Sequence, residues 1–456
     1  MKRVILVNPP IVGGKGDVTG TGTAYWPIVL AQINAMIYKR YAVSVVDMFG
    51  MNPHRKTVDG GIVRYGVPIE EISNFISPGD VVIVFSGHAI AHSTVMKLLG
   101  LIGKCNPKKM IVVEGSNFVN GYPLDIFYKE FKEVGATIIA GDPYDVVIKA
   151  IDGDYDTDKR HLYRYDVGGL LMPRWNEFPL KNYWSLPYAH APKSNRMYVQ
   201  IYTSFGCPNR CAFCTNPYMN KSSWRPKPIK NVIDEMKYWY NNGVREFHIE
   251  DLNPTPTKVR AMELSKGIIA SGMIPLIKIA SGTRLESLDE DTLTAMYLAG
   301  FRYLSFSPES GSPFLLEEMN KKFDLDHAER LVRFLDGKMV TQACFILGFP
   351  GETGLDIERT EEYAKRLAKA GVDEFAFFNF IPSLGAAASK GVVIPTDKMY
   401  FSSDWRGLNT KLKKKRLEIM MGLFSIKMMR HPIRTIMRFF DTKIWMMLRR
   451  KVAYGL

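Results

Sequence analysis

The sequence predicts an α/β protein with a doubly wound, flavodoxin-like parallel sheet, then a partial (β/α)6 barrel, then a basic helical tail. Three observations support this prediction. Strand patterns alternate with helical patterns over residues 1–150 and again over residues 197–400. Three of the five cysteines lie within eight residues, directly after the first strand pattern of the second region. The last stretch, residues 411–456, carries 13 Lys and Arg against two acidic residues.

Length and composition limit the classes of protein that fit. A chain of 456 residues exceeds one ordinary core, so we expect two or three domains. The opening MKRVILVNPP has an apolar run too short for a secretory signal, and no stretch of 18 apolar residues predicts a spanning helix. Few cysteines, mostly clustered, indicate a reducing compartment. We therefore expect a cytoplasmic protein, with the inner membrane face as a second location for the tail.

The first region, residues 1–150, contains five short apolar strand patterns separated by helical patterns. One helix is predicted over Pro27–Tyr38 and another includes Met96–Gly103. Open parallel sheets of this type bind ligands at the carboxyl ends of their strands. Polar, weakly periodic residues 151–196 are predicted to form a surface connector. The predicted strands are Arg3–Val7, Val43–Asp47, Val81–Ser86, Met110–Val113 and Thr137–Ala140.

The second region, residues 197–400, repeats a strand–helix rhythm six times, with helices such as Ile229–Tyr240 and Asp289–Ala299. Six such repeats suit an incomplete parallel barrel, whose active site lies at the carboxyl ends of its strands. The predicted strands are Val199–Ser204, Glu246–Glu250, Ile274–Ala280, Tyr303–Ser307, Gln342–Leu347 and Glu374–Asn379.

The cysteine motif is the strongest chemical signal in the chain. Cys207, Cys211 and Cys214 follow the first barrel strand, where ligand-binding loops belong. Three thiolates can hold three irons of a [4Fe–4S] cubane and leave the fourth iron open for S-adenosylmethionine. A structural zinc site is the alternative, but such sites usually pair two Cys-x2-Cys motifs. The lone Cys105 and Cys344 offer no second pair and are predicted to be small buried residues.

The spacing Cys-x3-Cys-x2-Cys, with the aromatic Phe213 before the third cysteine, resembles the signature of the radical S-adenosylmethionine superfamily. This resemblance implies an acidic pair near the ligand at residues 250–251 and a glutamate, Glu309, that reaches the nucleotide or methionyl part. It also implies backbone approaching the adenine at residues 348–351. The cofactor-binding residues that it implies are Phe213, Glu250, Asp251, Ser281, Arg284, Glu309, Ser310, Gly348, Pro350 and Gly351.

The first region and connector resemble the cobalamin-binding domain that precedes many radical enzymes of this type. The resemblance rests on Asn8-Pro9-Pro10, Trp26-Pro27, Asp47, Met172-Pro173-Arg174 and Tyr183, and extends to about residue 385. It implies a corrin lying on the strand ends and facing the barrel mouth, without the usual Asp-x-His-x-x-Gly motif. Glu114-Gly115 stands where a Gly-Gly pair is expected, and Gly141-Asp142 replaces a Gly-Glu-Gly turn. The implied corrin-binding residues are Asn8, Pro9, Pro10, Ser86, Gly87, Glu114 and Gly115.

Two histidines after the third strand, His88 and His92, have two interpretations. They could touch cobalt or the corrin amides, or form a hydrogen-bonded loop and helix start, which is the more common arrangement.

The tail combines cations with two apolar helical stripes. Lys413–Arg416 would meet anionic head groups if the tail were an interfacial membrane helix, and Trp445 would suit the interface. A helical cap on the barrel, with solvated cations, fits equally well. Nucleic acid is disfavoured because the cations alternate with aliphatic residues. The two stripes are Leu417, Met420, Met421, Phe424 and Met428, then Ile433, Ile436, Met437, Phe440, Ile444, Met447 and Leu448.

These patterns lead us to expect a cobalamin-dependent radical enzyme that methylates an unactivated carbon of a hydrophobic substrate, such as a lipid, an isoprenoid or a tetrapyrrole. Phe375–Phe380, Trp224 and the tail would line its pocket, and a reduced flavodoxin or ferredoxin would supply electrons. The alternatives are a cyclase that forms carbon–carbon bonds without methyl transfer, and a non-catalytic membrane-docked iron–sulfur module. A tRNA methylthiolase is disfavoured, because its first domain needs three cysteines and this one has Cys105 alone.

Overall fold

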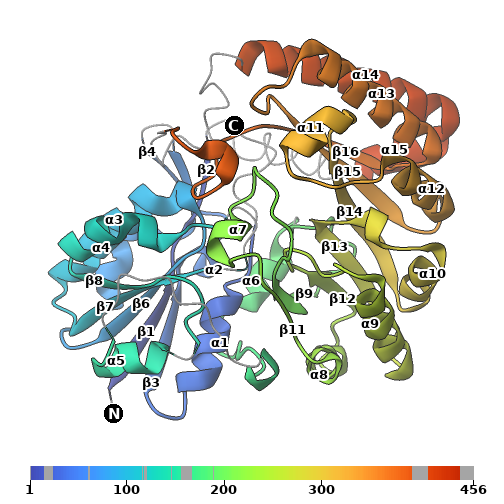
Figure 1. Cartoon of the computed structure of the whole chain (residues 1–456). Helices are drawn as coiled ribbons and strands as arrows, with labels where there is room; N and C mark the ends of the chain where they lie inside the picture. The colour runs from blue at the N-terminus through green and yellow to red at the C-terminus, as the bar shows by residue number, and fades with distance from the viewer. Residues whose placement is uncertain are drawn as a thin grey trace.

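The computed structural model describes residues 2–14, 24–59, 62–115, 117, 121–144, 146–155, 167–187, 189–392 and 409–441. Two parallel sheets stand beside each other, the first drawn in blue and cyan and the second from green to orange (Figure 1). Within the described chain, none of the helices has both the length and the apolar character that crossing a bilayer requires.

The first sheet has five parallel strands in the order β3-β1-β6-β7-β8, the flavodoxin-like order that the sequence predicts. Alternate side chains of each strand point to opposite faces, where two separate apolar cores form, one containing α1 and α5 and the other α3 and α4. Strand order reverses between β1 and β6, so a ligand crevice is expected there. The elements are β1 (Arg3–Asn8), α1 (Ile28–Ile37), β3 (Ala42–Asp47), β6 (Val81–Ser86), α3 (His92–Lys104), β7 (Lys109–Glu114), α4 (Tyr128–Glu133), β8 (Ala136–Ile139) and α5 (Val147–Asp152).

A small antiparallel sheet beside the first sheet was not predicted. It has the order β2-β5-β4 and joins β2 (Ile11–Gly14), β4 (Lys56–Asp59) and β5 (Ile62–Tyr65). Each strand has only four residues, which is too short to show a convincing alternation in the sequence.

The second sheet has six parallel strands in sequence order, as the partial barrel requires. Its helices cover an outer face of aliphatic and aromatic residues. The short helices α2 (Met48–Met51), α6 (Leu180–Ser185), α7 (Asn216–Met219) and α11 (Pro313–Glu318) lie in loops. The main elements are β9 (Tyr198–Ile201), α8 (Ile229–Asn241), β12 (Glu246–Ile249), α9 (Lys258–Ala270), β13 (Leu276–Thr283), α10 (Glu290–Leu298), β14 (Phe301–Glu309), α12 (Leu325–Leu335), β15 (Val340–Leu347), α13 (Gly354–Ala370) and β16 (Glu374–Asn379).

The first barrel strand is shorter than predicted. Strand β9 ends at Ile201, and the next residues form β10 (Ser204–Gly206), which pairs antiparallel with β11 (Trp224–Pro226). The prediction of one strand over Val199–Ser204 was therefore wrong. Thr203 is drawn away from the ladder because its backbone N–H and hydroxyl both donate to the buried Asp251.

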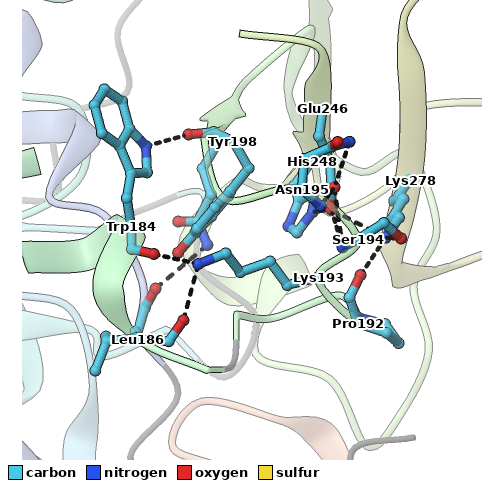
Figure 2. Close-up of polar contacts among 12 residues, drawn as sticks. Trp184, Leu186, Pro192, Lys193, Ser194, Asn195, Tyr198, Glu246, His248 and Lys278 are labelled. Carbon is cyan, nitrogen blue, oxygen red and sulfur yellow. Dashed lines mark hydrogen bonds and ion pairs between the residues drawn. The ribbon is translucent and has the colours of Figure 1, made fainter. Parts of the chain in front are cut away.

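The inner face of the barrel is polar, and the connector closes its amino-terminal end. Glu246 accepts hydrogen bonds from His248 at 2.8 Å and from the backbone N–H groups of Ser194 and Asn195, and pairs with Lys278 at 2.9 Å (Figure 2). Burial opposes ionisation of Glu246, but the hydrogen bond from His248 and the charge of Lys278 hold its pKa at about 2. A charged group at this depth is tolerated because it is fully paired.

The described part of the connector lies only partly on the surface, where it was predicted to lie, because several of its apolar side chains insert into the core while others stay exposed. Trp175, Phe178, Tyr183 and Leu186 belong to one apolar core that also contains residues of the first sheet and of the barrel. The sequence did not reveal this, because aromatic residues that fill gaps between two domains follow no period.

The tail begins as a cap on the barrel. Helix α14 (Asn409–Arg430) packs Leu412, Ile419 and Leu423 into the core next to α13, while α15 (Pro432–Asp441) follows it. Lys415 pairs with Glu361 at 2.7 Å. The predicted residues Ile444, Trp445, Met447 and Leu448 lie outside the described residues, as do the side chains of Arg438 and Phe440.

Glu246→Gln is expected to lower the free energy of unfolding by about 3–5 kcal/mol, because Lys278 would be left buried without its charge partner. Because the folded pKa lies below the usual value of about 4.3, the stabilisation from Glu246 should be complete above that value and lost as the pH falls towards 2. Urea unfolding of both proteins between pH 7 and pH 3 measures this. The exposed Glu133→Gln is the control, and an equal loss in both variants would contradict the prediction.

Candidate functional site

The cysteine loop starts from a tightly constrained strand end. Cys207 directly follows β10, whose last residue, Gly206, has a φ of +74°. A side chain at this position would also bring Cβ within 2.2 Å of the Ser223 carbonyl oxygen. Only glycine meets both conditions, so the backbone before the first cysteine is fixed by sterics.

The three cysteines lie close enough to act on one another electrostatically. Burial, together with the neighbouring Cys211 and Cys207, raises the pKa of Cys214 to about 12. Burial also raises the pKa of Cys211. A cluster binds thiolates, so its assembly at Cys211 and Cys214 would have to displace their protons.

Amide groups surround the sulfur atoms. The backbone N–H of Asn216 donates to Cys214 Sγ at 3.4 Å, and the Nδ2 atoms of Asn209 and Asn253 lie 3.4 and 3.8 Å from Cys207 Sγ. Such donors favour a thiolate and tune the reduction potential of an iron–sulfur cluster. The loop therefore fits a cluster bound through three cysteines.

A zinc site and an iron–sulfur cluster differ in how closely their ligands must approach one another. In the described part of the chain, no three Cys, His, Asp or Glu side chains converge on a point where one metal ion could bind. Zinc needs all its ligands around one ion at about 2.0–2.3 Å. A cubane attaches each thiolate to a different iron and so accepts wider spacing between them.

A buried charged group adjoins the cluster loop. Glu309 ends β14 with a φ of +67°, a left-handed conformation that is rare for glutamate. Its Oε1 lies 2.8 Å from Lys321 Nζ, which in turn lies 5.9 Å from the centre of the Phe213 ring. Burial raises the pKa of Glu309 while the Lys321 charge opposes that rise.

Beside this pair, Arg284 Nε lies 2.5 Å from Glu286 Oε1. Burial raises the pKa of Glu286, and its Oε2 is buried without a hydrogen-bond partner in the described structure. Buried charges of both signs with one unused acceptor fit a ligand that carries its own ammonium and carboxylate groups.

The acidic pair at residues 250–251 divides into two roles. Asp251 accepts hydrogen bonds from Thr203 N, Thr203 Oγ1 and Ser204 Oγ, each at 2.6 Å, and burial raises its pKa to about 6. Its carboxyl group therefore orients the start of the cluster strand. Glu250 instead pairs with His190 Nδ1 at 2.5 Å.

The remaining barrel residues predicted from sequence make internal contacts. Ser281 Oγ donates to the Asp251 carbonyl oxygen at 2.5 Å. Ser310 Oγ lies 2.9 Å from Thr360 Oγ1, and Gly348 N donates to Glu352. Pro350 and Gly351 form the turn after β15, where Gly351 has a φ of +86°.

The predicted residues of the first sheet gather at the carboxyl ends of its strands. Asn8 Nδ2 donates to Asp47 Oδ1 at 2.7 Å and Pro9-Pro10 follows, while Gly87 follows β6. Ser86 Oγ is buried and has no hydrogen-bond partner among the described residues. An orphaned hydroxyl at the switch point fits a ligand with polar edge groups, such as a corrin.

The next strand end and the two histidines complete this surface. Glu114 accepts a hydrogen bond from Leu124 N at 3.0 Å, and Gly115 follows it. Burial and the charge of His190 lower the pKa of His88 to about 4. Tyr25 lies between these two histidines, 5.3 Å from the His88 ring and 5.0 Å from the His190 ring. His92 begins α3 and contacts Tyr122 and Glu130, as the hydrogen-bonded alternative predicts.

Sequence reasoning missed Lys321, Glu286, Asn117, His190 and Asn253. Each lies in a loop or, for Glu286, in the short 3-10 helix Leu285–Ser287, outside any recognisable motif, and becomes part of the site through tertiary packing. Cys105 and Cys344 also differ from their prediction, because both are only partly buried. Cys344 lies 3.5 Å from Ser305 Oγ on the polar inner face.

A partial parallel barrel with a three-cysteine loop defines the class of enzyme that uses a cluster and S-adenosylmethionine together. Residues 201–364 match the family model described as the radical SAM superfamily, so the chain carries a domain of that superfamily. Its cofactors are a [4Fe–4S] cluster and S-adenosylmethionine.

Curated relatives support this family. The chain is 29% identical over 247 residues to the cytidylyl-2-hydroxyethylphosphonate methyltransferase of Streptomyces wedmorensis, a match that covers 52% of this chain and 46% of the relative. It is 26% identical over 253 residues to the anaerobic magnesium-protoporphyrin IX monomethyl ester cyclase of Cereibacter sphaeroides, covering 54% and 38%. The chain thus spans less than half the length of either relative.

Solved structures confirm the fold over most of the chain. The radical S-adenosylmethionine methyltransferase TsrM from Kitasatospora setae superposes with a TM-score of 0.61 at 16% identity, covering 85% of this chain and 75% of that one. The cobalamin-dependent S-adenosylmethionine radical enzyme OxsB gives the same TM-score at 13% identity, covering 91% and 56%. Both sheets and their order in the chain therefore belong to a known two-domain fold.

Gly206→Ala is expected to prevent stable cluster assembly, because the added Cβ would collide with the Ser223 carbonyl and the backbone would be strained. Iron and sulfide content after anaerobic reconstitution measures this. Gly79→Ala is a matched control, since its φ is also positive, at +87°, but the space around it is open. Equal iron content in the two variants would contradict the prediction.

Proposed function

We propose that this protein is a cobalamin-dependent radical S-adenosylmethionine enzyme that methylates an unactivated carbon. The supporting observation is that Asn117, at the ligand-binding edge of the flavodoxin-like sheet, hydrogen-bonds to the segment directly before the three cysteines. At the same edge, the buried Ser86 hydroxyl has no hydrogen-bond partner among the described residues. When bound, the cluster with S-adenosylmethionine supplies a carbon-centred radical, and cobalamin supplies the methyl group.

The residues of the chain would have distinct tasks in this reaction. Cys207, Cys211 and Cys214 would hold the cluster, while the Glu309–Lys321 and Arg284–Glu286 pairs would orient the charged amino-acid part of S-adenosylmethionine. The strand-end residues of the first sheet, including Asn8, Ser86 and Gly115, would contact the corrin. Burial of the charged pairs excludes water, which protects a radical from side reactions.

The side chains on the inner wall of the barrel support a proposal about the substrate class. Phe378 on β16 is 45% exposed and suits an apolar part of the substrate. Deeper on the same wall, Glu374 accepts hydrogen bonds from Tyr303 and Gln342. We therefore propose that the substrate has an apolar part, which carries the reacting carbon, and also a polar group that contacts the inner wall of the barrel. A reduced flavodoxin or ferredoxin would supply the electrons.

The second candidate is carbon–carbon bond formation without methyl transfer. The similarity to a cyclase favours it. In that case the first sheet would shape the pocket, and cobalamin would take no part in the reaction.

The two candidates differ in product mass. Reconstituted enzyme with dithionite and S-adenosylmethionine should release 5′-deoxyadenosine, and Cys207→Ala should reduce that release to background, because the cluster would lose one of three ligands. Hydroxocobalamin should bind and give a corrin absorbance. A substrate that gains one methylene supports methylation, loss of two hydrogens supports cyclisation, and no deoxyadenosine from wild-type enzyme rejects both.

The outward face of the tail helices would dock on an anionic lipid surface. Leu417, Met421 and Phe424 on α14, with Ile433 and Met437 on α15, each expose half or more of their side-chain surface. The opposite side of α14 is already packed on the barrel, so α14 is apolar on two sides. Exposed Lys411, Lys413 and Lys414 lie at the amino-terminal end of α14 and would match anionic head groups.

Sedimentation with vesicles tests this docking. The full chain should bind phosphatidylglycerol vesicles and should bind phosphatidylcholine vesicles much less, and high salt should release it. The double variant Leu417→Gln/Phe424→Gln should bind at least about tenfold more weakly, because it loses apolar area. Ile274→Gln is the control, since Ile274 is 83% exposed away from the tail. Equal binding to both vesicle types would reject the proposal.

A further inference from the structure

A residue in the loop after β7 of the first sheet hydrogen-bonds to the segment directly before the cysteines. Asn117, in the loop after β7, is 2% exposed. Its Oδ1 accepts a hydrogen bond from Gly206 N at 2.8 Å, and its Nδ2 donates to the Ser204 carbonyl oxygen at 3.0 Å. The Asn117 side-chain amide therefore hydrogen-bonds to one N–H group and one carbonyl group of β10, as the backbone of a neighbouring strand would.

Two more contacts join the same two regions. Asp142, after β8, forms an ion pair with Arg225 on β11, opposite Phe205. Asp125 accepts a hydrogen bond from Tyr218 of α7 at 3.0 Å. The hairpin and α7, which enclose the cysteine loop, are thus held from the first sheet on several sides, and α7 lies between the two sheets in Figure 1.

These contacts bear on the cluster because they act on the residue directly before the first cysteine. Gly206 is the residue before Cys207, and its backbone has no freedom to adjust to an altered neighbour. Glu114 and Gly115, two of the residues assigned to corrin binding, lie only three and two positions before Asn117. A ligand that displaced Gly115 would also displace Asn117 and with it the two hydrogen bonds to the segment before Cys207.

We infer that Asn117 is a positioning residue that couples ligand binding on the first sheet to the geometry of the cluster, and hence to its reduction potential. This inference rests on the proposed function. Coupling between two sites is reciprocal, so the cluster state must also alter corrin affinity.

The experiment uses the full chain, reconstituted anaerobically, and records the EPR spectrum and reduction midpoint of the cluster with and without hydroxocobalamin. In wild type, hydroxocobalamin should shift both. Asn117→Ala should lose this shift and release iron to a chelator about tenfold faster, since two buried backbone groups lose their partner. Asn117→Asp keeps the acceptor for Gly206 but cannot donate to Ser204, so it should give a smaller shift.

Asn34→Ala is the matched control, because Asn34 is also buried and also bridges the first sheet's helix to the connector, at Arg174 and Glu177. It should behave as wild type. If circular dichroism shows that Asn117→Ala does not fold, the response of Asn117→Asp to hydroxocobalamin tests the coupling instead. A wild-type cluster that does not respond to hydroxocobalamin, or Asn117 variants that respond like wild type, would overturn the coupling alone. A wild-type chain that binds no cluster would overturn the proposed function and this inference with it.

Discussion

The buried carboxyl group of Asp251 is the contact on which the rest of the site depends. It accepts three hydrogen bonds from Thr203 and Ser204, which draws these residues out of the barrel ladder and turns the chain into the β10–β11 hairpin. The hairpin in turn delivers Cys207. A loop with little secondary structure can hold three sulfur atoms in place only because its first residues are fixed by partners on both sides, Asp251 from the barrel and Asn117 from the first sheet.

Much of the architecture could be read from the sequence. Strands β6 and β16 have the predicted bounds, and every other strand of the two large sheets except β9 overlaps its predicted segment closely. Apolar runs of five or six residues between helices of clear period identify such strands well. The cysteine spacing identified the chemistry for a different reason, since three thiolates in eight residues have few structural uses.

The features that the sequence could not give are those made by tertiary contact. Lys321 approaches Glu309 only after α11 has folded back, and His190 meets Glu250 only when the connector lies across the barrel. The left-handed backbone of Glu309 could not be predicted from its residue type, because glutamate does not normally adopt this conformation. The buried anchors of the connector were missed for the same reason: its aromatic residues are placed by two separate domains and not by one helix or strand.

The common apolar core has a consequence for how the two halves of the chain relate. Trp26 from the first region donates through its backbone N–H to Gln200 of β9 at 2.7 Å and through its indole to Tyr198, and Tyr183 of the connector donates to Asp47 at 2.8 Å. Removal of either half would expose aromatic surface and leave these buried polar groups without hydrogen-bond partners. The two halves should therefore melt in one transition, and a chimera that exchanges one half would have to exchange the connector as well.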